Sequence, residues 1–391
     1  MSQAAVRPLV VFADDWGRHP SSCQHLVRHL LPHREIVWVN TIGTRPPRLD
    51  WGTAKRVMGK FKSWASPSGK HQSPGSEHAT LAPRTISPKM WPSFKSQFGR
   101  ELNRKLLLRS LRPIFESLPQ PPNVITTLPL VADLVGELPA HRWTYYCVDD
   151  FSVWPGYDGE TMLRMERDLV PKVQEIVTVS ETLVAHIAKL DRPAHLLTHG
   201  VDLDHWTTKP PEKVPGLDGP EPPFVVFWGV IDRRMDVAFV KALAASLRVG
   251  SLVLVGPRED PAPELVTIPR VRVLPPMPFA KLPALAATAS VLVMPYADLP
   301  VTRAMQPLKL KEYLVTGKPV VVRDLPSTRP WADCCDVCDT AEGFAARVNE
   351  RLQGGLPAGQ QAARERLEDE GWAEKAKQFE RWVDGVTSAT T

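Results

Sequence analysis

Three residues in the second half of the chain have types and spacing suited to holding a nucleoside diphosphate. Pro307, Lys309 and Glu312 lie in one segment whose apolar pattern predicts a helix over residues 307–315. Proline suits the first turn of a helix, and the free N–H groups of that turn attract anions. Lys309 would add a positive charge, and Glu312, about one turn further on, can accept two hydrogen bonds from a ribose diol. An ordinary surface helix with a Lys–Glu pair is the alternative that spacing alone leaves open.

Two aspartates and a glycine at strand ends in the first half form a second candidate group. Asp149 and Asp150 end one predicted strand, and Gly17 follows another. Either carboxylate could bind a sugar or an incoming hydroxyl, and the glycine would let a ligand approach the backbone. A helix cap or turn is the alternative for the aspartates, and a plain turn for Gly17. Neighbouring strand residues point to opposite faces, so neither this pair nor Asp14–Asp15 predicts a metal site.

The cysteines and histidines do not predict a metal centre. Three of the five cysteines cluster near residue 335, but no second cysteine or histidine pair lies nearby to complete a zinc site. The odd total also argues against a disulfide framework. We expect ordinary reduced cysteines near a helix start. We interpret the prominent histidines as surface or packing residues: His19, His25 and His199.

The elements that must position these residues follow one repeated order: a short apolar strand, a polar turn and an amphipathic helix. Strands are predicted at 9–13, 35–39, 123–127, 143–147 and 175–179, and again at 224–229, 251–255, 271–274, 291–295 and 319–322. Helices are predicted at 98–115, 236–246, 279–287, 307–315, 341–352 and 361–384. This alternation predicts an α/β fold with two doubly wound parallel sheets. Ligands bind beyond the carboxyl ends of such strands, so we expect the active site between the domains.

A linker rich in proline divides the two halves. Residues 207–223 contain six prolines and two glycines, a composition that cannot continue a helix or a central strand. We therefore expect a first Rossmann-like domain over 1–206, the linker over 207–223 and a second Rossmann-like domain over 224–360. Residues 361–391 would form a helical tail that packs back across the cleft.

Positive charge concentrates in one segment. Residues 51–112 hold thirteen Lys or Arg against two acidic residues, an excess of +11, which leaves 5 − 11 = −6 for the remainder. Aromatic residues alternate with these charges, which is typical of a surface that docks on an anionic membrane or on nucleic acid. A solvated loop is the third interpretation. We favour the membrane and expect no nucleic-acid partner.

Composition favours a cytoplasmic protein without a spanning segment. Of the 391 residues, 43% are hydrophobic and 23% are charged, as in soluble globular proteins. No window reaches eighteen apolar residues, and the N-terminus has too short an apolar run for a secretory signal. A glycine-rich dinucleotide fingerprint follows neither first strand, which disfavours an NAD-dependent enzyme.

The chain resembles the GT-B glycosyltransferases, specifically family 4 and its bacterial polysaccharide members. The resemblance is strongest where a proline-leucine-lysine segment leads to glutamate-tyrosine-leucine and then to glycine-lysine-proline-valine-valine, at residues 307–321. Further matching segments are 229–232, 252–257, 294–296, 146–151, 179–183 and 199–202.

The resemblance implies roles for individual residues. Glu312 would bind the donor ribose, Lys309 the pyrophosphate, and one of Arg233 and Arg234 would supply a basic donor contact. Asp149, Asp150, Arg233 and Lys309 are the implied catalytic group, with Gly17, Asp149 and Asp150 on the acceptor side. The remaining implied donor contacts are Gly229, Gly256, Pro257, Tyr296, Gln306, Pro307 and Leu308.

The resemblance also implies the reaction. A retaining transferase would move a sugar from a nucleotide-diphosphate-sugar to a hydroxyl of a glycan or lipid-linked acceptor, without a metal or other cofactor. Many members carry another glutamate eight residues before the one that matches Glu312, but this chain has Ala304 there. Gln306 and nearby backbone N–H groups would have to hold the sugar instead. The alternative is a nucleotide-sugar-binding protein of the same fold that has lost turnover.

Overall fold

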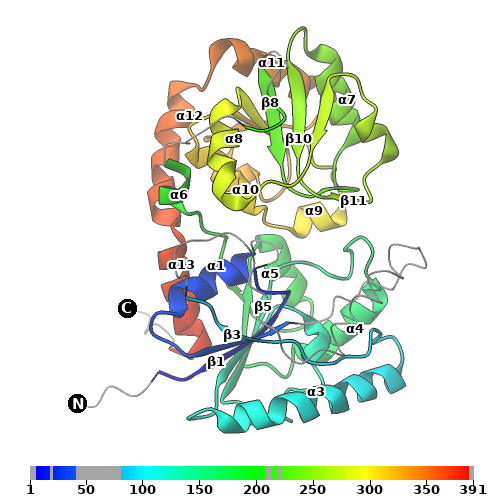
Figure 1. Ribbon diagram of the computed structural model, residues 1–391, viewed down its shortest axis with the longest axis vertical. Helices are drawn as coiled ribbons and strands as arrows, with labels where there is room; N and C mark the ends of the chain where they lie inside the picture. Colours follow the sequence, from blue (N-terminus) through cyan, green and yellow to red (C-terminus); the bar gives the residue numbers. More distant parts are fainter. Residues whose placement is uncertain (1–5, 18–20, 41–80, 208–213, 218–221, 387–391) are drawn as a thin grey trace.

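A computed structural model of the chain describes residues 6–17, 21–40, 81–207, 214–217 and 222–386. Its described part contains two large parallel sheets, one above the other in Figure 1. Residues 51–80, almost half of the predicted 51–112 segment, and much of the predicted linker lie outside the described residues.

The first sheet has seven strands in the order β3-β2-β1-β4-β5-β6-β7. They are β1 (Leu9–Ala13), β2 (Ile36–Asn40), β3 (Arg84–Ile86), β4 (Asn123–Thr126), β5 (Arg142–Cys147), β6 (Glu175–Thr178) and β7 (His195–Leu196). β1 is buried at every position because parallel strands covered by helices on both faces need continuous apolar runs. All pairs are parallel, so the carboxyl ends of the strands lie at one edge of the sheet.

Helices cover this sheet and begin with side-chain caps. They are α1 (Ser22–Leu30), α3 (Gln97–Ser117), α4 (Gly159–Leu169) and α5 (Glu181–Ala188). Ser21 caps α1 by accepting a hydrogen bond from the Gln24 backbone, and Ser180 caps α5 from Leu183 in the same way. These caps fix where each helix starts after its strand, and hence what its first turn faces.

The second sheet has six strands in the order β12-β10-β8-β13-β14-β15. They are β8 (Phe224–Trp228), β10 (Ser251–Val255), β12 (Val271–Leu274), β13 (Val291–Met294), β14 (Val320–Arg323) and β15 (Asp336–Cys338). Two very short strands, β9 (Ile231–Asp232) and β11 (Arg258–Glu259), form a separate pair next to the carboxyl ends of β8 and β10. The main helices around this sheet are α7 (Val237–Ser246), α8 (Leu282–Thr288), α9 (Pro300–Ala304), α10 (Leu308–Val315) and α11 (Ala341–Gly354).

The tail returns to the first domain. After α12 (Ala358–Ala363) and the 3-10 helix η5 (Arg364–Glu370), helix α13 (Trp372–Val383) packs on α1, β4 and β5, along one side of the molecule (Figure 1). Its buried residues belong to the core of the first domain, and the Phe379 ring lies 5.0 Å from Tyr146. Arg34, buried beneath it, donates 2.7 Å to Asp384 and 3.2 Å to Glu380.

The chain therefore crosses between the domains twice, and the two crossings are bonded together. The first leads into the short helix α6 (Leu203–Thr207), and the second joins η5 to α13. The Val201 N–H donates 2.9 Å to the Glu370 carbonyl, and Val201 forms a parallel bridge with Gly371. The Lys311 ammonium of α10 also donates 2.5 Å to the Glu370 carboxylate.

The α/β prediction of two parallel sheets is confirmed, and the predicted strands agree with observed ones to within one or two residues at each end. Three sheet strands were missed, namely β3, β7 and β15, because each has only two or three residues at an edge of its sheet. Cys338 ends β15, whereas Cys334 and Cys335 are buried just before it, and all three thiols are free. The predicted single helix over 361–384 is instead η5 followed by α13, because Gly371 interrupts it.

Candidate functional site

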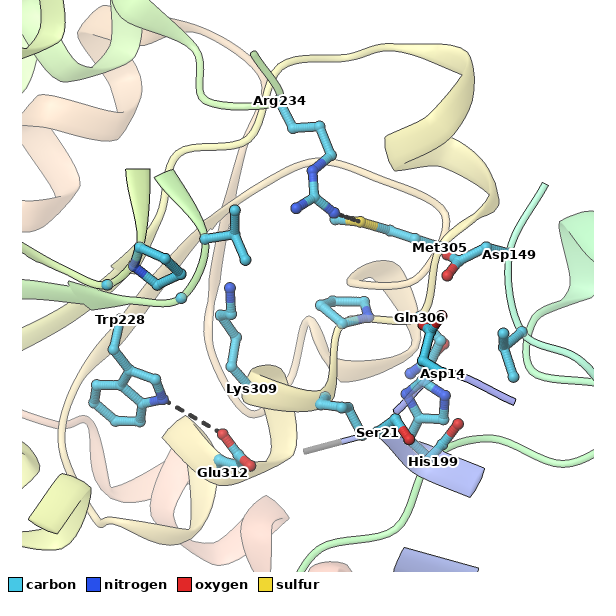
Figure 2. A pocket seen from close by; sticks show the side chains of 18 of the residues that line it. Asp14, Ser21, Asp149, His199, Trp228, Arg234, Met305, Gln306, Lys309 and Glu312 are labelled. Carbon is cyan, nitrogen blue, oxygen red and sulfur yellow. Dashed lines mark hydrogen bonds between the residues drawn. The ribbon is translucent and has the colours of Figure 1, made fainter. Parts of the chain in front are cut away.

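A cavity of about 510 Å³ lies between the two domains. It is lined by residues at or just beyond the carboxyl ends of five strands, as expected for ligand sites in parallel sheets: Ala13, Val148, Trp228, Val255 and Tyr296. The segment 305–309 and Glu312 line it as well (Figure 2). The start of α10 therefore faces both domains.

Lys309 projects into this cavity from the second domain (Figure 2). Pro307 is the N-cap of α10, one position earlier than the predicted first turn. The Lys309 ammonium donates 2.5 Å to the Tyr296 hydroxyl and lies 4.5 Å from the centre of the Phe227 ring. Gly229, with φ of 138°, allows this approach, since a Cβ there would lie 2.9 Å from the Lys309 Cε atom. The site thus holds a cation against aromatic rings and next to a helix start.

Glu312 lies one turn further along α10, on the cavity wall. The Trp228 indole N–H donates 3.4 Å to its carboxylate, a long hydrogen bond that leaves most of the acceptor capacity unused (Figure 2). Burial raises the pKa of Glu312 to about 7, while Trp228 and the Lys309 charge act in the opposite direction. The unused acceptor positions suit a diol, and the raised pKa makes the ionised form that accepts two hydrogen bonds dependent on pH near neutrality.

Of the two adjacent arginines, Arg234 lines the cavity. Its guanidinium is held by Asp232 at 2.8 Å and lies 4.9 Å from the ring centre of Trp154, which belongs to the first domain. Arg233 does not line the cavity. Its side chain is 54% exposed and pairs with Asp260 at 3.6 Å. This removes Arg233 from the predicted donor and catalytic contacts and leaves Arg234 as the inward-facing cation.

Of the two adjacent aspartates, only Asp149 lines the cavity, and Asp150 does not. Burial raises the pKa of Asp149 to about 7 against the opposing effect of Arg234. Asp150 lies outside the lining. It accepts 3.0 Å and 2.5 Å hydrogen bonds from the backbone and hydroxyl of Ser152, as a turn residue does. Successive residues diverge at a strand end, so only one of the pair faces the cavity.

Gly17 also lies outside the lining. Its φ is 76°, and its N–H donates 3.1 Å to the Gln24 side chain, which corresponds to the plain-turn interpretation. The remaining predicted donor residues do line the cavity: Gly229, Gly256, Pro257, Tyr296, Gln306, Pro307 and Leu308.

Sequence reasoning missed several lining residues. From the first domain they include the α1 cap Ser21, Thr127 after β4, and an aromatic group on the loop after β5, namely Phe151, Trp154 and Tyr157. From the second domain they include Trp228, Met277 and Phe279. The signal available was position, because each follows or ends a predicted strand or begins a helix. His199, interpreted as a surface or packing residue, lines the cavity too.

No group of three or more potential metal ligands occurs among the residues that the structure describes. None of the helices in that part is long and apolar enough to cross a membrane.

Comparison with known proteins identifies the fold. No family model matches the chain. A Bacillus subtilis protein named "Putative teichuronic acid biosynthesis glycosyltransferase TuaH" is 30% identical over 141 residues, which are 34% of this chain and only 35%, about a third, of that relative.

Solved structures cover far more of the chain. They include a sucrose-phosphate synthase from Thermosynechococcus elongatus, with 16% identity, a TM-score of 0.69 and 98% of this chain and 100% of that one covered. Anabaena HepE in complex with UDP-glucose has 11% identity and a TM-score of 0.67, with 97% of this chain and 100% of that one covered. The α,α-trehalose 6-phosphate synthase of Burkholderia multivorans has 14% identity and a TM-score of 0.61, with 97% of this chain and 98% of that one covered.

Proposed function

We propose that this chain, whose two parallel-sheet domains have the GT-B fold, is a glycosyltransferase that uses a nucleotide-diphosphate-sugar donor. One observation carries the proposal. Lys309, Arg234 and Glu312 converge with the start of α10 on a single cavity between the domains. Two cations and free helix N–H groups suit a diphosphate, and a carboxylate one turn away suits the ribose attached to it.

The chemistry follows from this placement. The bond between the anomeric carbon and the diphosphate oxygen breaks, and a bond from that carbon to the acceptor oxygen forms. Lys309, Arg234 and the first turn of α10 stabilise the negative charge that develops on the leaving diphosphate. Asp149, whose raised pKa lies near neutrality, hydrogen-bonds the acceptor hydroxyl from the opposite wall and can take up its proton.

The finer features of the reaction are part of the same proposal. Retention of anomeric configuration rests on the family resemblance of residues 307–321. Two cations at the diphosphate would replace the charge that a divalent metal supplies elsewhere, so we propose a metal-independent reaction. HepE was solved with UDP-glucose, and the name of the Bacillus subtilis relative refers to teichuronic acid biosynthesis. We therefore propose a hexose nucleotide as donor and a cell-surface glycan or lipid-linked sugar as acceptor, on the cytoplasmic side of the membrane.

The proposed function is tested by a thermal-shift screen of nucleoside diphosphates and their glucose conjugates, followed by transfer assays with EDTA present. We expect at least one matched pair to raise the unfolding temperature and to support sugar release or transfer in EDTA. A screen in which no nucleotide stabilises the protein would contradict the proposal. Activity lost in EDTA and restored by manganese would contradict only its metal independence.

A non-catalytic nucleotide-sugar-binding protein is the second candidate. The observation that favours it is Ala304, a buried residue at the position where many relatives of the resembling family carry a glutamate. Its carbonyl accepts 2.6 Å from Ser180, so the position serves the contact between domains. The same screen separates the candidates, because this one predicts stabilisation by sugar nucleotides without release or transfer of the sugar.

We also propose that the first domain docks on an anionic membrane surface. Of the predicted 51–112 segment, the described part exposes two large aromatic side chains, Trp91 at 48% and Phe98 at 73%, beside Lys89 and Lys95. Aromatic rings with neighbouring cations suit the interface of a bilayer with anionic headgroups. An enzyme held there would meet a lipid-linked acceptor.

Liposome flotation checks this docking. We expect the protein to float with vesicles that contain phosphatidylglycerol, to float less at high salt, and to lose most binding in the double variant Trp91→Ser, Phe98→Ser. Val249→Ser is the matched control, because Val249 is 58% exposed on the second domain. Equal binding to neutral vesicles, or equal loss in the control, would contradict the proposed surface.

A further inference from the structure

His199 is a buried polar residue on the cavity wall whose ring nitrogens have no hydrogen-bond partner among the described residues. Its residue exposure is 6%, and both Nδ1 and Nε2 are unpaired. The nearby Gln306 backbone acts to raise the pKa of the ring, but it forms no hydrogen bond with either nitrogen. A buried donor and acceptor without partners destabilise a protein, and native structures rarely leave both unpaired. An unpaired group that faces a cavity points to a ligand.

The surroundings of His199 fix it in place. The buried Lys311 ammonium of α10 donates to the His199 carbonyl and to the Thr198 hydroxyl at 3.4 Å. The Trp372 ring of α13 lies 6.1 Å from the imidazole, packed over Gly200 where a Cβ would lie 2.8 Å from that indole. The backbone is therefore held by α10 and α13, and the ring faces the cavity between Ser21 and Gln306 (Figure 2).

The protonation state of the imidazole selects the ligand chemistry. Burial, together with the nearby Lys311 charge, lowers the pKa of His199 to about 3, so the ring is neutral at physiological pH. A neutral imidazole has one donor and one acceptor, which complements a hydroxyl group. A diphosphate offers only acceptors and already has Lys309 and Arg234 as charge partners.

The position of His199 in the cavity indicates which hydroxyl group of a ligand it would contact. Gln306 directly precedes the start of α10, where the diphosphate is placed in the proposed function, and His199 lies beside it (Figure 2). A sugar attached to that diphosphate would extend into this part of the cavity. Ala304, which has no polar side chain, offers it no hydrogen bond. We propose that His199 binds a hydroxyl group of the transferred sugar, an assignment that rests on the proposed function.

The test compares binding of a nucleoside diphosphate with binding of its glucose conjugate, using the matched pair that stabilises the wild-type protein. In His199→Phe, we expect the Kd of the sugar nucleotide to rise about tenfold, as for one lost hydrogen-bonded group, with the Kd of the diphosphate unchanged. The unliganded variant should unfold at the same temperature or higher, because an apolar ring replaces an unpaired polar one. His199→Gln, which keeps a donor and an acceptor, should recover part of the affinity.

His25→Phe is the matched control. This histidine is also buried and stacks on Trp372 at 4.7 Å, but it does not line the cavity. We expect it to leave the ratio of the two Kd values at the wild-type level. An unchanged ratio of the two Kd values in His199→Phe would overturn the assignment, whether neither ligand or both ligands bind more weakly. If neither ligand binds the wild-type protein, the proposed function itself fails, which is a different result.

Discussion

Replacing Lys309 with alanine is expected to lower kcat for sugar transfer about 100- to 1000-fold, the range for loss of one charge partner of a leaving group. Lys309 is the only lysine among the described cavity-lining residues, and it is held 2.5 Å from the Tyr296 hydroxyl. In the proposed reaction its charge would act mainly as the diphosphate departs, so KM for the donor should change much less than kcat. Steady-state kinetics with the donor found by the screen measures both quantities.

Two further variants make this prediction specific. Lys309→Arg keeps the charge but not the compact ammonium that fits beside Gly229, so it should retain only part of the activity. Lys318→Ala is the matched control, because Lys318 lies just beyond α10, outside the cavity lining, and donates 2.9 Å to the Ala287 carbonyl. If Lys309→Ala and Lys318→Ala have the same kcat, Lys309 is not the charge partner of the diphosphate.

Replacing Glu312 with alanine is expected to weaken binding of the nucleoside diphosphate about 10- to 100-fold, since hydrogen bonds to a charged group contribute about 1.5–3 kcal/mol. The sugar nucleotide should weaken by the same factor, unlike in His199→Phe, because the ribose is common to both ligands. Calorimetry with UDP and 2′-deoxy-UDP, or the pair for the preferred base, tests the contact directly. Wild type should prefer the ribose form, and Glu312→Ala should lose that preference. A preference that survives the substitution would place the ribose elsewhere.

Binding should also depend on pH through Glu312. Its pKa in the unliganded protein is about 7, and the ionised carboxylate is the form that accepts two hydrogen bonds. Affinity should therefore level off above pH 7 and fall by up to about tenfold per pH unit below it. Glu312→Gln should abolish this dependence in calorimetric titrations from pH 5.5 to 8.5. A similar slope in that variant would assign the titration to another group.

The sequence predicted the second domain and its site well. Apolar runs such as Ser251–Val255 are buried parallel strands, and the donor helix combines local features, a proline at its start with Lys309 and Glu312 at fixed spacing. Such a motif keeps its geometry wherever the helix is placed, so ten of the predicted donor residues line the cavity: Gly229, Arg234, Gly256, Pro257, Tyr296, Gln306, Pro307, Leu308, Lys309 and Glu312.

The first domain was less predictable because its contributions come from turns. Whether Asp149 or Asp150 faces the cavity depends on one backbone rotation that composition does not encode, and the same holds for Arg233 and Arg234 in the second domain. His199 is informative in another way. Nothing near it in sequence suggests a ligand, and its position depends on Lys311 and Trp372, residues 112 and 173 positions further along the chain.

The paired crossings restrict how the two domains can move. Val201 and Gly371 are bridged, so the two connections run side by side along one side of the molecule (Figure 1). Two connections that are bonded together on one side allow the domains to rotate about an axis along the connections, but they restrict twisting and sliding of one domain against the other. Opening for substrate entry would then swing the wall that carries Asp149 away from the wall that carries Lys309. His199 lies close to these connections and would stay near its neighbours on both walls throughout that movement.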